Sequence, residues 1–462
     1  MTASRRSAPA PNLVLTIVCA GIVLANLDLF IVNVALPDIA RDFGGAKLGD
    51  LSWILNGYAI VYAALLIFCG RLAERFPRNQ SFLLGVAIFT AASAACALAH
   101  SVEALVACRL AQAAGAALLT PTSLGLILAT FPADRRGGAV RIWAAIGGFA
   151  AALGPLVGGL LVTYSWRWIF LVNLPIGLLA LAVGGIKLPR ISGHAAPAPY
   201  LWAAALVTLG IATLIFGIVK GNDLGWTAPA VLLSFAAAAV MLAGFIAHCL
   251  RSANPFVDPR LFSISEFTRA TLTMAPFATA FGGFLLSLVL WEESVWHWPA
   301  ATIGMAIAPG PFMVPVTSLL IAGRLIARYG ATAVVAAGLT VFAAGVVVWA
   351  VFASPNPNLG FAILCTIPSG IGVGLTLPTL MGMGTSVLPA SSFATGSGVI
   401  NMVRQIGFAV GVACLVAVIG TSTALTTHMA AFRLAWWLMA AITAFGLLPL
   451  LLLKRRPTSP AV

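Results

Sequence analysis

The residues with the most demanding chemistry are two opposite charges inside apolar stretches of the chain, Asp28 and Arg109. Asp28 lies about nine residues, or about 13 Å of helix, from the later end of its stretch. Arg109 lies at a similar depth, about 10 Å into a later stretch. An unpaired acid at the centre of a spanning helix costs about 2.5–3.5 kcal/mol on insertion scales. Two opposite charges at matching depth can offset this cost by forming an ion pair.

Such a pair could also bind and release a proton. Protonation of Asp28 would free Arg109, and deprotonation would restore the pair, which makes a two-state element. Gln112 lies on the same helical face as Arg109, three residues later. The alternative is a static buried salt bridge that only fixes helix packing, but intramembrane charges are functional by default. We therefore expect Asp28 to carry a coupling proton and Arg109 to tune it.

Other polar residues are weaker candidates. Glu292 and Glu293 end a later apolar stretch near His297 and could carry protons or attract cations, although we favour a hydrated helix end. Four side chains are candidates for lining a cavity: Asn33, Gln112, Arg404 and Gln405. The last two lie about 10 Å into their stretch, where they could contact a substrate or close a helix interface. The seven cysteines show no CxxC pair or metal-ligand spacing, so no metal or cofactor is expected.

The elements that must position these side chains are membrane-spanning helices. The 462 residues are 61% hydrophobic and 8% charged, whereas a soluble domain has about 25% charged residues. A bilayer core about 30 Å thick needs about 20 apolar residues per helix, and continuous apolar runs argue against barrel strands. About fourteen stretches qualify, near residues 13–36, 52–70, 80–100, 103–129, 139–163, 168–186, 200–220, 229–250, 268–291, 302–322, 331–353, 359–384, 397–420 and 433–453.

The basic residues predict the orientation of these spans. With the N-terminus inside, 18 of the 25 Lys and Arg residues fall in inside loops and tails, and five fall outside. Basic residues favour the cytoplasmic side, so we expect both termini in the cytoplasm and the spans in a bacterial-type inner membrane. The net charge of +13 then serves topology and contact with anionic lipid, and no nucleic-acid partner is expected.

A short internal repeat indicates two related halves. Gly70–Phe76 recurs as Gly323–Tyr329, 253 residues later, in inside loops after the second and tenth spans. If the halves correspond, each has six spans and two extra spans lie between them. The sequence thus predicts an all-α 6+2+6 plan with bundles at 1–186 and 268–462 and two central helices at 187–267. Parallel halves that rock about a central site are a transporter architecture.

Six segments carry recognisable motifs: Leu27–Pro37, Gly70–Arg78, Arg109–Gln112 with Gly115, Gly154–Gly159, Trp166–Phe170 with Asn173 and Pro175, and Gly396–Gly411 with Arg404 and Gln405. Together, in this order and spacing, they resemble the major facilitator superfamily, specifically its fourteen-spanner drug:proton antiporter branch. The resemblance covers nearly the whole chain. Phe30, Glu74 and Pro77 depart from the usual residues, which are Thr, Asp and Gly.

The resemblance implies a role for the inside loop that contains Gly70, Glu74, Arg75 and Arg78. An acid at a helix end can bind the exposed N–H groups of a neighbouring helix, so Glu74 would latch the two halves together. The alternative is a solvated loop that only sets topology. Ala327 stands in place of Glu74 in the second copy, so only one loop can latch in this way.

The resemblance also singles out Gly154, Pro155, Gly158 and Gly159 as an antiporter helix motif. Small residues let helices approach closely, and proline bends a span. The motif would then form a tight, leak-proof interface that also hinges. Ordinary packing of small residues is the alternative.

The function that the resemblance implies is a proton-coupled antiporter. It would act as a monomer and export small lipophilic, neutral or cationic compounds from the cytoplasm by alternating access. Few acids are embedded, so multiply charged cations are poorly served. The chain lacks a G-x-x-x-x-G-K-[ST] motif and a nucleophile elbow, so neither ATP drive nor an enzyme is expected, and no channel filter is legible. A metabolite exporter, uniporter or symporter on the same fold remains open.

The charge distribution makes a direct prediction about topology. A single cysteine introduced between residues 454 and 462, in a cysteine-free background, should resist an impermeant maleimide in intact cells and react after permeabilisation. A cysteine at Tyr164, in a predicted outside loop, is the matched positive control. Labelling of the C-terminal cysteine in intact cells would contradict the predicted orientation.

Overall fold

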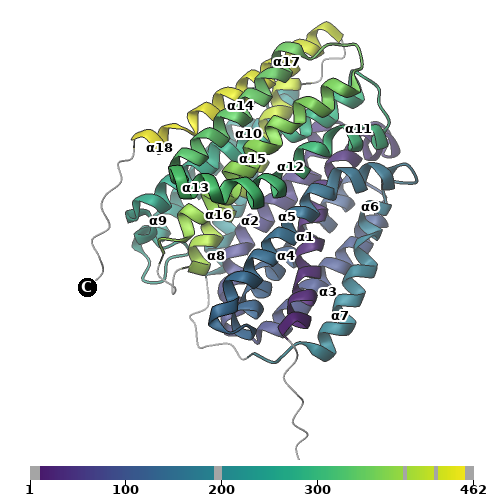
Figure 1. Ribbon diagram of the computed structural model, residues 1–462. Coiled ribbons are helices and arrows are strands. Elements are labelled where there is room, and N and C mark those ends of the chain that lie inside the picture. Colours follow the sequence, from purple (N-terminus) through teal and green to yellow (C-terminus); the bar gives the residue numbers. More distant parts are fainter. Residues whose placement is uncertain (1–10, 192–199, 389–392, 421–424, 453–462) are drawn as a thin grey trace, which may run out of the picture.

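The computed structural model describes residues 11–191, 200–388, 393–420 and 425–452, and every regular element in these ranges is helical (Figure 1). Fourteen spans in the described chain are long and apolar enough to cross a membrane, which confirms the all-α class and the predicted count. The elements are α1 (Pro11–Asp42), α2 (Leu48–Arg75), α3 (Arg78–Ala97), α4 (Val102–Thr130), α5 (Ala133–Val162), α6 (Trp168–Leu171), α7 (Asn173–Lys187), α8 (Leu201–Leu224), α9 (Pro229–Arg251), η1 (Pro259–Ser263), α10 (Ser265–Ser294), α11 (Ala300–Ile307), α12 (Pro309–Thr317), η2 (Ser318–Ala322), α13 (Gly323–Tyr329), α14 (Ala331–Phe352), α15 (Leu359–Thr385), α16 (Phe393–Ile419), α17 (Leu425–Phe445) and α18 (Leu448–Leu452).

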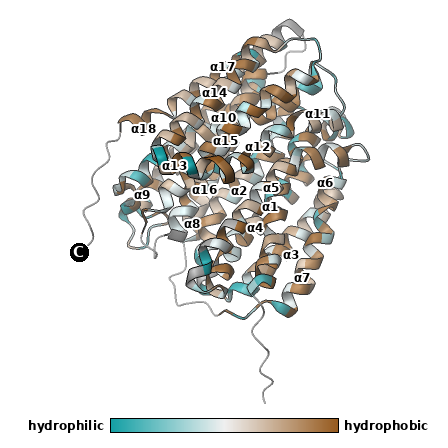
Figure 2. Ribbon diagram, in the orientation of Figure 1, coloured by the Kyte–Doolittle hydropathy of each residue, from teal (hydrophilic) through white to brown (hydrophobic). Residues whose placement is uncertain are grey.

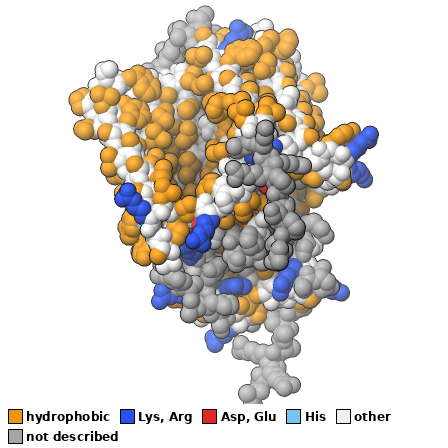
Figure 3. Space-filling model, turned by 90° about the vertical axis from the view of Figure 1, so that its left-hand side faces the viewer, with side chains coloured by type: hydrophobic (Ala, Val, Ile, Leu, Met, Phe, Trp, Pro, Cys, Tyr) orange, Lys and Arg blue, Asp and Glu red, His pale blue; other side chains and the backbone are white. Residues whose placement is uncertain are grey.

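The spans alternate in direction, so α1 begins and α18 ends on the same side of the molecule (Figure 1). We call this side the terminal face, and the side where α1 ends and α2 begins the opposite face. Hydrophobic residues fill the middle of the helices, and hydrophilic residues gather near helix ends and connections (Figure 2). Large apolar side chains such as Leu233 and Val240 of α9 are exposed, and one side of the molecule is mostly hydrophobic (Figure 3). Lipid is the solvent that suits this surface.

Two helix pairs join the first six spans to the last six. One pair is α2 with α16, and the other is α5 with the tenth span, which contains α11 and α12. The second pair is very close near the opposite face: a Cβ placed on Gly159 would lie 2.5 Å from the carbonyl oxygen of Ala300, and one on Gly304 would lie 2.6 Å from that of Pro155. Only glycine allows backbones to meet at this distance. These contacts hold the halves together at the opposite face.

The two central helices are not a detached spacer. Helix α8 packs against α9, α2 and α16, and Lys220 of α8 forms an ion pair with Asp50 of α2 at 2.6 Å. Asn222 of α8 donates a hydrogen bond to the carbonyl of Ala417 in α16. At the terminal face, Arg71 of α2 donates to the carbonyl of Pro255 at 2.6 Å, beyond α9. The inserted pair therefore contacts both halves.

The repeated segments differ from the loops that the sequence predicted. Residues 70–75 continue α2 as helix, and Gly323–Tyr329 forms α13. The connection after α2 shrinks to Phe76 and Pro77 because the backbone carries intrahelical hydrogen bonds up to Phe76, whose N–H donates to the carbonyl of Leu72. The expectation of two short loops at these positions was wrong in this respect.

The close contact of α5 and α11 makes a prediction about the closed opposite face. Gly159→Val should force α5 and α11 apart, because its side chain would overlap the backbone at Ala300. Spin labels at Tyr164 and Pro299, measured by double electron–electron resonance in a cysteine-free background, should report a longer distance than in the parent protein.

Gly148→Val is the matched control, because it lies on the same helix and a Cβ there would meet nothing within 4 Å. Equal distance distributions for the two variants would show that the glycine contact does not hold this face closed.

Candidate transport site

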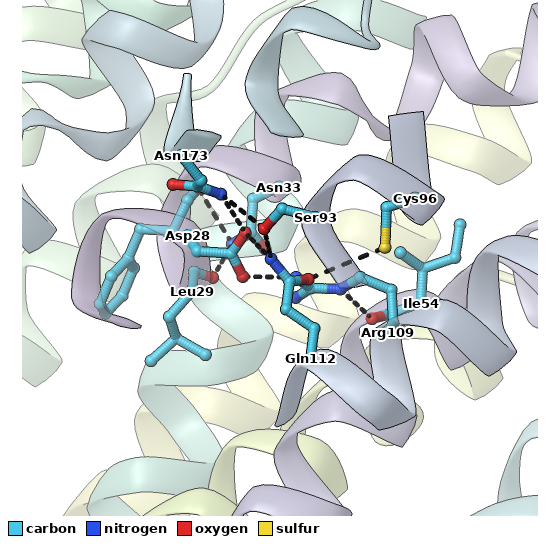
Figure 4. Close-up of polar contacts among 10 residues, drawn as sticks. Asp28, Leu29, Asn33, Ile54, Ser93, Cys96, Arg109, Gln112 and Asn173 are labelled. Atoms are coloured by element: carbon cyan, nitrogen blue, oxygen red, sulfur yellow. Dashed lines mark hydrogen bonds and ion pairs between the residues drawn. The ribbon is translucent and has the colours of Figure 1, made fainter. Parts of the chain in front are cut away.

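Asp28 lies at the centre of a fully buried polar network in the first six spans (Figure 4). Its Oδ2 accepts an ion-paired hydrogen bond from Nη1 of Arg109, whose side chain is 1% exposed. Its Oδ1 accepts hydrogen bonds from the amides of Gln112 at 2.8 Å and Asn173 at 3.2 Å. A carboxylate has only acceptor atoms, and all three partners present donors to it. The network therefore fits an ionised Asp28.

Four helices bring this network together. Arg109 and Gln112 share one face of α4, and Oε1 of Gln112 also accepts from Arg109 at 2.5 Å. Ser93 of α3 accepts from Gln112 at 2.8 Å and from Asn173 at 3.4 Å, so its hydroxyl orients both amides. Asn173 is the first residue of α7, where the sixth span breaks from α6. All three donors to Asp28 therefore come from helices of the first six spans.

The guanidinium of Arg109 has a second environment on α2. Its Nε donates to the carbonyl of Ile54 at 3.4 Å, and its Cζ lies 4.1 Å from the centre of the Tyr58 ring. A cation over an aromatic face is attracted by the ring quadrupole. Tyr58 in turn stacks on Tyr62 with ring centroids 6.0 Å apart. Loss of the Asp28 charge would therefore leave Arg109 with its partners on α2 and with Gln112 on its own helix.

A small cavity of about 40 Å³ lies between the halves and reaches Arg109. Its lining residues come from five helices: Leu29, Phe30 and Asn33 of α1, Leu55, Asn56 and Ala59 of α2, Arg109 of α4, Gly282 and Leu285 of α10, and Phe408, Ala409 and Val412 of α16. This space suits water molecules, whereas pockets for drug-sized ligands measure about 300–1,000 Å³. In this conformation the space is too small for a drug-sized ligand, so binding one requires the halves to move.

The structure brings some sequence-predicted residues together and separates others. Asp28, Arg109 and Gln112 meet in one network, while Asn33 lines the cavity and donates to the carbonyls of Leu29 and Phe30 of its own helix. Arg404 and Gln405 of α16 lie one helical turn before the cavity-lining Phe408 and Ala409. They are outside the hydrogen-bonded network around Asp28.

Glu292 corrects the favoured interpretation of a hydrated helix end. Its side chain is 0% exposed, and neither carboxyl oxygen has a hydrogen-bond partner among the described residues. The reason is its helical face: Leu285 and Leu288, seven and four residues earlier on α10, face interior cavities. Glu293 is only partly buried and lies near Arg41 and Asp38 of α1. Neither acid joins the Asp28 network.

The two predicted motifs can be placed only in part. The side chain of Glu74 lies outside what the structure describes, so the latch remains a prediction. Arg75 is exposed, and Arg78 donates to the carbonyl of Gly125 in α4, within its own half. In the helix motif, a Cβ on Gly154 or Gly158 would lie 2.8 Å from atoms of Phe30 or Ile31 in α1. The motif thus contacts α1 on one side and, through Gly159, α11 on the other.

Two members of the network were not identified from the sequence as site residues. Asn173 appeared only as part of a family motif, and a position just after a break in an apolar span was its available signal. Ser93 stands in an apolar stretch among many small residues, and nothing in its spacing marks it. Both needed the packing of α3 and α7 to be found.

Fourteen spanning helices, a buried charge network and a cavity lined by both halves define a membrane transporter. Residues 18–319 and 272–462 match the model of the family described as the Major Facilitator Superfamily. The chain belongs to this superfamily, as its motifs predicted, and is a transporter rather than an enzyme.

Known relatives refine this assignment. The chain is 32% identical to the multidrug resistance protein Stp of Mycobacterium tuberculosis, over 88% of this chain and 76% of that protein. It is 31% identical to the tetracenomycin C resistance and export protein of Streptomyces glaucescens, over 89% of this chain and 76% of that protein. A solved structure of peptide transporter POT in complex with sulfate has the same fold, with a TM-score of 0.68 at 17% sequence identity. The match covers 96% of this chain and 95% of that one.

The buried pair makes a prediction about stability. Arg109→Met should destabilise the purified protein by about 3–5 kcal/mol, because it leaves Asp28 as an unpaired buried charge. The double variant Asp28→Asn with Arg109→Met should recover much of this loss. Thermal unfolding in detergent, followed by tryptophan fluorescence, measures all three.

The exposed pair of Arg41 and Asp38, with side chains 66% and 28% exposed, is the control. Arg41→Met should change stability by about 0–1 kcal/mol, as exposed pairs do. If Arg109→Met and Arg41→Met shift unfolding equally, the buried pair does not stabilise the fold.

Proposed function

We propose that this protein exports small lipophilic molecules from the cytoplasm in exchange for protons, by alternating access. The single observation that carries the proposal is the Asp28 carboxylate, fully buried with an Arg109 partner that also lines the cavity between the halves. An intramembrane acid of this kind is a candidate proton carrier. The names of relatives that confer multidrug resistance or export an antibiotic support the direction and class of substrate.

A coupling step follows from the contacts. A proton delivered to Asp28 removes its negative charge and turns one of its acceptor oxygens into a donor. Nη1 of Arg109 then loses its ionic partner, while its contacts with Ile54 and Tyr58 on α2 remain available. Since α2 is one of the helices that join the halves, the charge of Asp28 would bias their arrangement. Export would then depend on protonation from outside and deprotonation inside.

The orientation of the closed conformation agrees with this direction of transport. With both termini in the cytoplasm, the opposite face, closed by Gly159 and Gly304, is the extracellular one. Such a conformation would receive substrate from the cytoplasmic side after the halves separate at the terminal face. Opening of the α5–α11 contact would then release it outside.

The proposal predicts that Asp28→Asn abolishes gradient-driven export. In proteoliposomes with an imposed proton gradient and a panel of dyes and antibiotics, the variant should lose at least tenfold in uphill transport, because its amide cannot be protonated and deprotonated. Exchange of labelled for unlabelled substrate without a gradient should persist, because that process needs no net proton movement.

Asp42→Asn is the matched control, because Asp42 is an exposed acid at the end of the same helix, where it pairs with Arg167 outside the network. If Asp28→Asn still concentrates substrate with normal pH dependence, the proton is carried elsewhere, and Glu292 is the next candidate. If the parent protein ignores the gradient altogether, the function is uniport or another exchange.

A further inference from the structure

Arg404 is a cation in the middle of the protein, and the part of the chain that the structure describes offers it no matching anion. It lies on α16, and it has no hydrogen bond or ion pair among the described residues. Its Nε is fully buried and unpaired. Arg109, which lies deep in another predicted span, is neutralised by Asp28. A guanidinium is always charged in proteins, and a buried charge is normally paired.

The position of Arg404 connects it to the cavity between the halves. Phe408, four residues later on the same face of α16, lines that cavity, and so does Ala409, four residues after Gln405. Gln405 is 0% exposed, and both its amide oxygen and its amide nitrogen lack a partner among the described residues. Three unsatisfied polar atoms, one on Arg404 and two on Gln405, thus lie one turn from the cavity.

The first half contributes a hydroxyl to the same place. Tyr62 of α2 faces α16, and its phenol interacts electrostatically with Arg404. The Tyr62 hydroxyl also lies 2.9 Å from Oγ1 of Thr120 in α4. One turn earlier on α2, Tyr58 stacks on Tyr62 and lies under Arg109. Two guanidinium groups therefore flank one pair of stacked tyrosines, and only one of them has a counter-ion.

We propose that Arg404, Gln405 and Tyr62 form a subsite that binds the acidic group of a lipophilic organic anion, such as a carboxylate. The guanidinium presents parallel N–H donors that match a carboxylate in a bidentate geometry. The Gln405 amide adds a donor, and the Tyr62 hydroxyl adds another if it turns away from Thr120, to which it donates in this conformation. The apolar lining at Phe408 and Ala409 suits the rest of the molecule. This subsite rests on the proposed export function and specifies its substrate class.

The alternative is that Arg404 only closes the interface between α2 and α16. A closing residue would be expected to bind across that interface, as Lys220 and Asn222 do from α8. Among the described residues, Arg404 forms no hydrogen bond or ion pair across it, and Gln405 beside it leaves its whole amide unpaired. The small number of embedded acids had favoured neutral or cationic substrates. A guanidinium with no counter-ion among the described residues, one turn from the cavity, favours an anion instead, and a negative cytoplasmic potential assists the exit of an anion.

Three probes with one fluorophore test the subsite by equilibrium binding to the full-length protein in lipid nanodiscs. Dansylglycine is a carboxylate, its methyl ester is neutral and dansylcadaverine is a cation, and empty nanodiscs correct for partitioning into lipid. The parent protein should bind dansylglycine at least tenfold more tightly than the ester. Arg404→Gln should remove this preference, weakening dansylglycine at least tenfold and the ester less than twofold. Arg404→Lys should retain part of it, because lysine keeps the charge without the bidentate geometry.

Arg324→Gln is the control, because Arg324 is an exposed arginine of the same half that donates to the carbonyl of Leu320 in the preceding turn. Equal weakening of all three probes by Arg404→Gln would assign Arg404 a structural role and overturn the subsite, as would tighter binding of dansylcadaverine than dansylglycine to the parent. Retained binding of the ester shows that Arg404→Gln is folded. If that variant does not fold, the subsite is tested by two other results: Gln405→Leu should weaken dansylglycine more than the ester, and the parent should bind dansylglycine more tightly than dansylcadaverine.

The subsite and the proposed export function fail separately. If the parent drives export with a proton gradient but shows no Arg404-dependent preference for the carboxylate, the subsite is wrong and the export function stands. If the preference depends on Arg404 but the gradient drives no transport, the subsite stands as a binding site and the export function is wrong.

Discussion

The cost of holding charge away from water is the constraint on which the rest of this structure depends. Asp28 and Arg109 are both buried in the apolar part of the chain, and neither is tolerable there without the other. The pair alone would leave donor and acceptor atoms unsatisfied, so Gln112, Asn173 and Ser93 complete it. These residues come from α1, α3, α4 and α7, so a single electrostatic requirement specifies the relative placement of four helices. Under the proposed function, the same requirement would make the network respond to a single proton on Asp28.

The interface between the halves follows a different rule, that of close packing without side chains. Gly159 and Gly304 let α5 and α11 meet at backbone distance near the opposite face, whereas the middle of the interface holds polar atoms and a small cavity. Small residues provide contact that depends on shape, which a modest tilt can break and remake. Charged residues provide contact that depends on protonation. The small residues, Gly159 and Gly304, lie near the opposite face, and the charged residue Arg109 lies at the cavity.

Much of this arrangement could be predicted from the sequence, because the bilayer imposes simple rules. Span length and hydropathy predicted the fourteen helices, and the depth of Asp28 and Arg109 made their pairing a natural expectation. The sequence failed where a result depends on which face a residue presents. Glu292 was favoured as a hydrated helix end, yet it shares the buried face of Leu288. Ser93 carries no local signal, because an ordinary small hydroxyl acquires its role only from neighbours on other helices. The helical continuation of residues 70–75 was missed because charged residues near the end of an apolar stretch suggested a loop.

The position of α8 limits how the halves can move. Near the opposite face this helix is fastened to α2 through Lys220 and Asp50, and to α16 through Asn222 and Ala417. Asp50 and Ala417 belong to different halves, so α8 bridges the interface between them. Separation of α2 from α16 near the opposite face would have to break one of these two contacts, whereas rotation of the halves about α8 would keep both. The halves would therefore rotate about an axis beside α8 and move apart most at α5 and α11, between which the described residues form no side-chain hydrogen bond or ion pair.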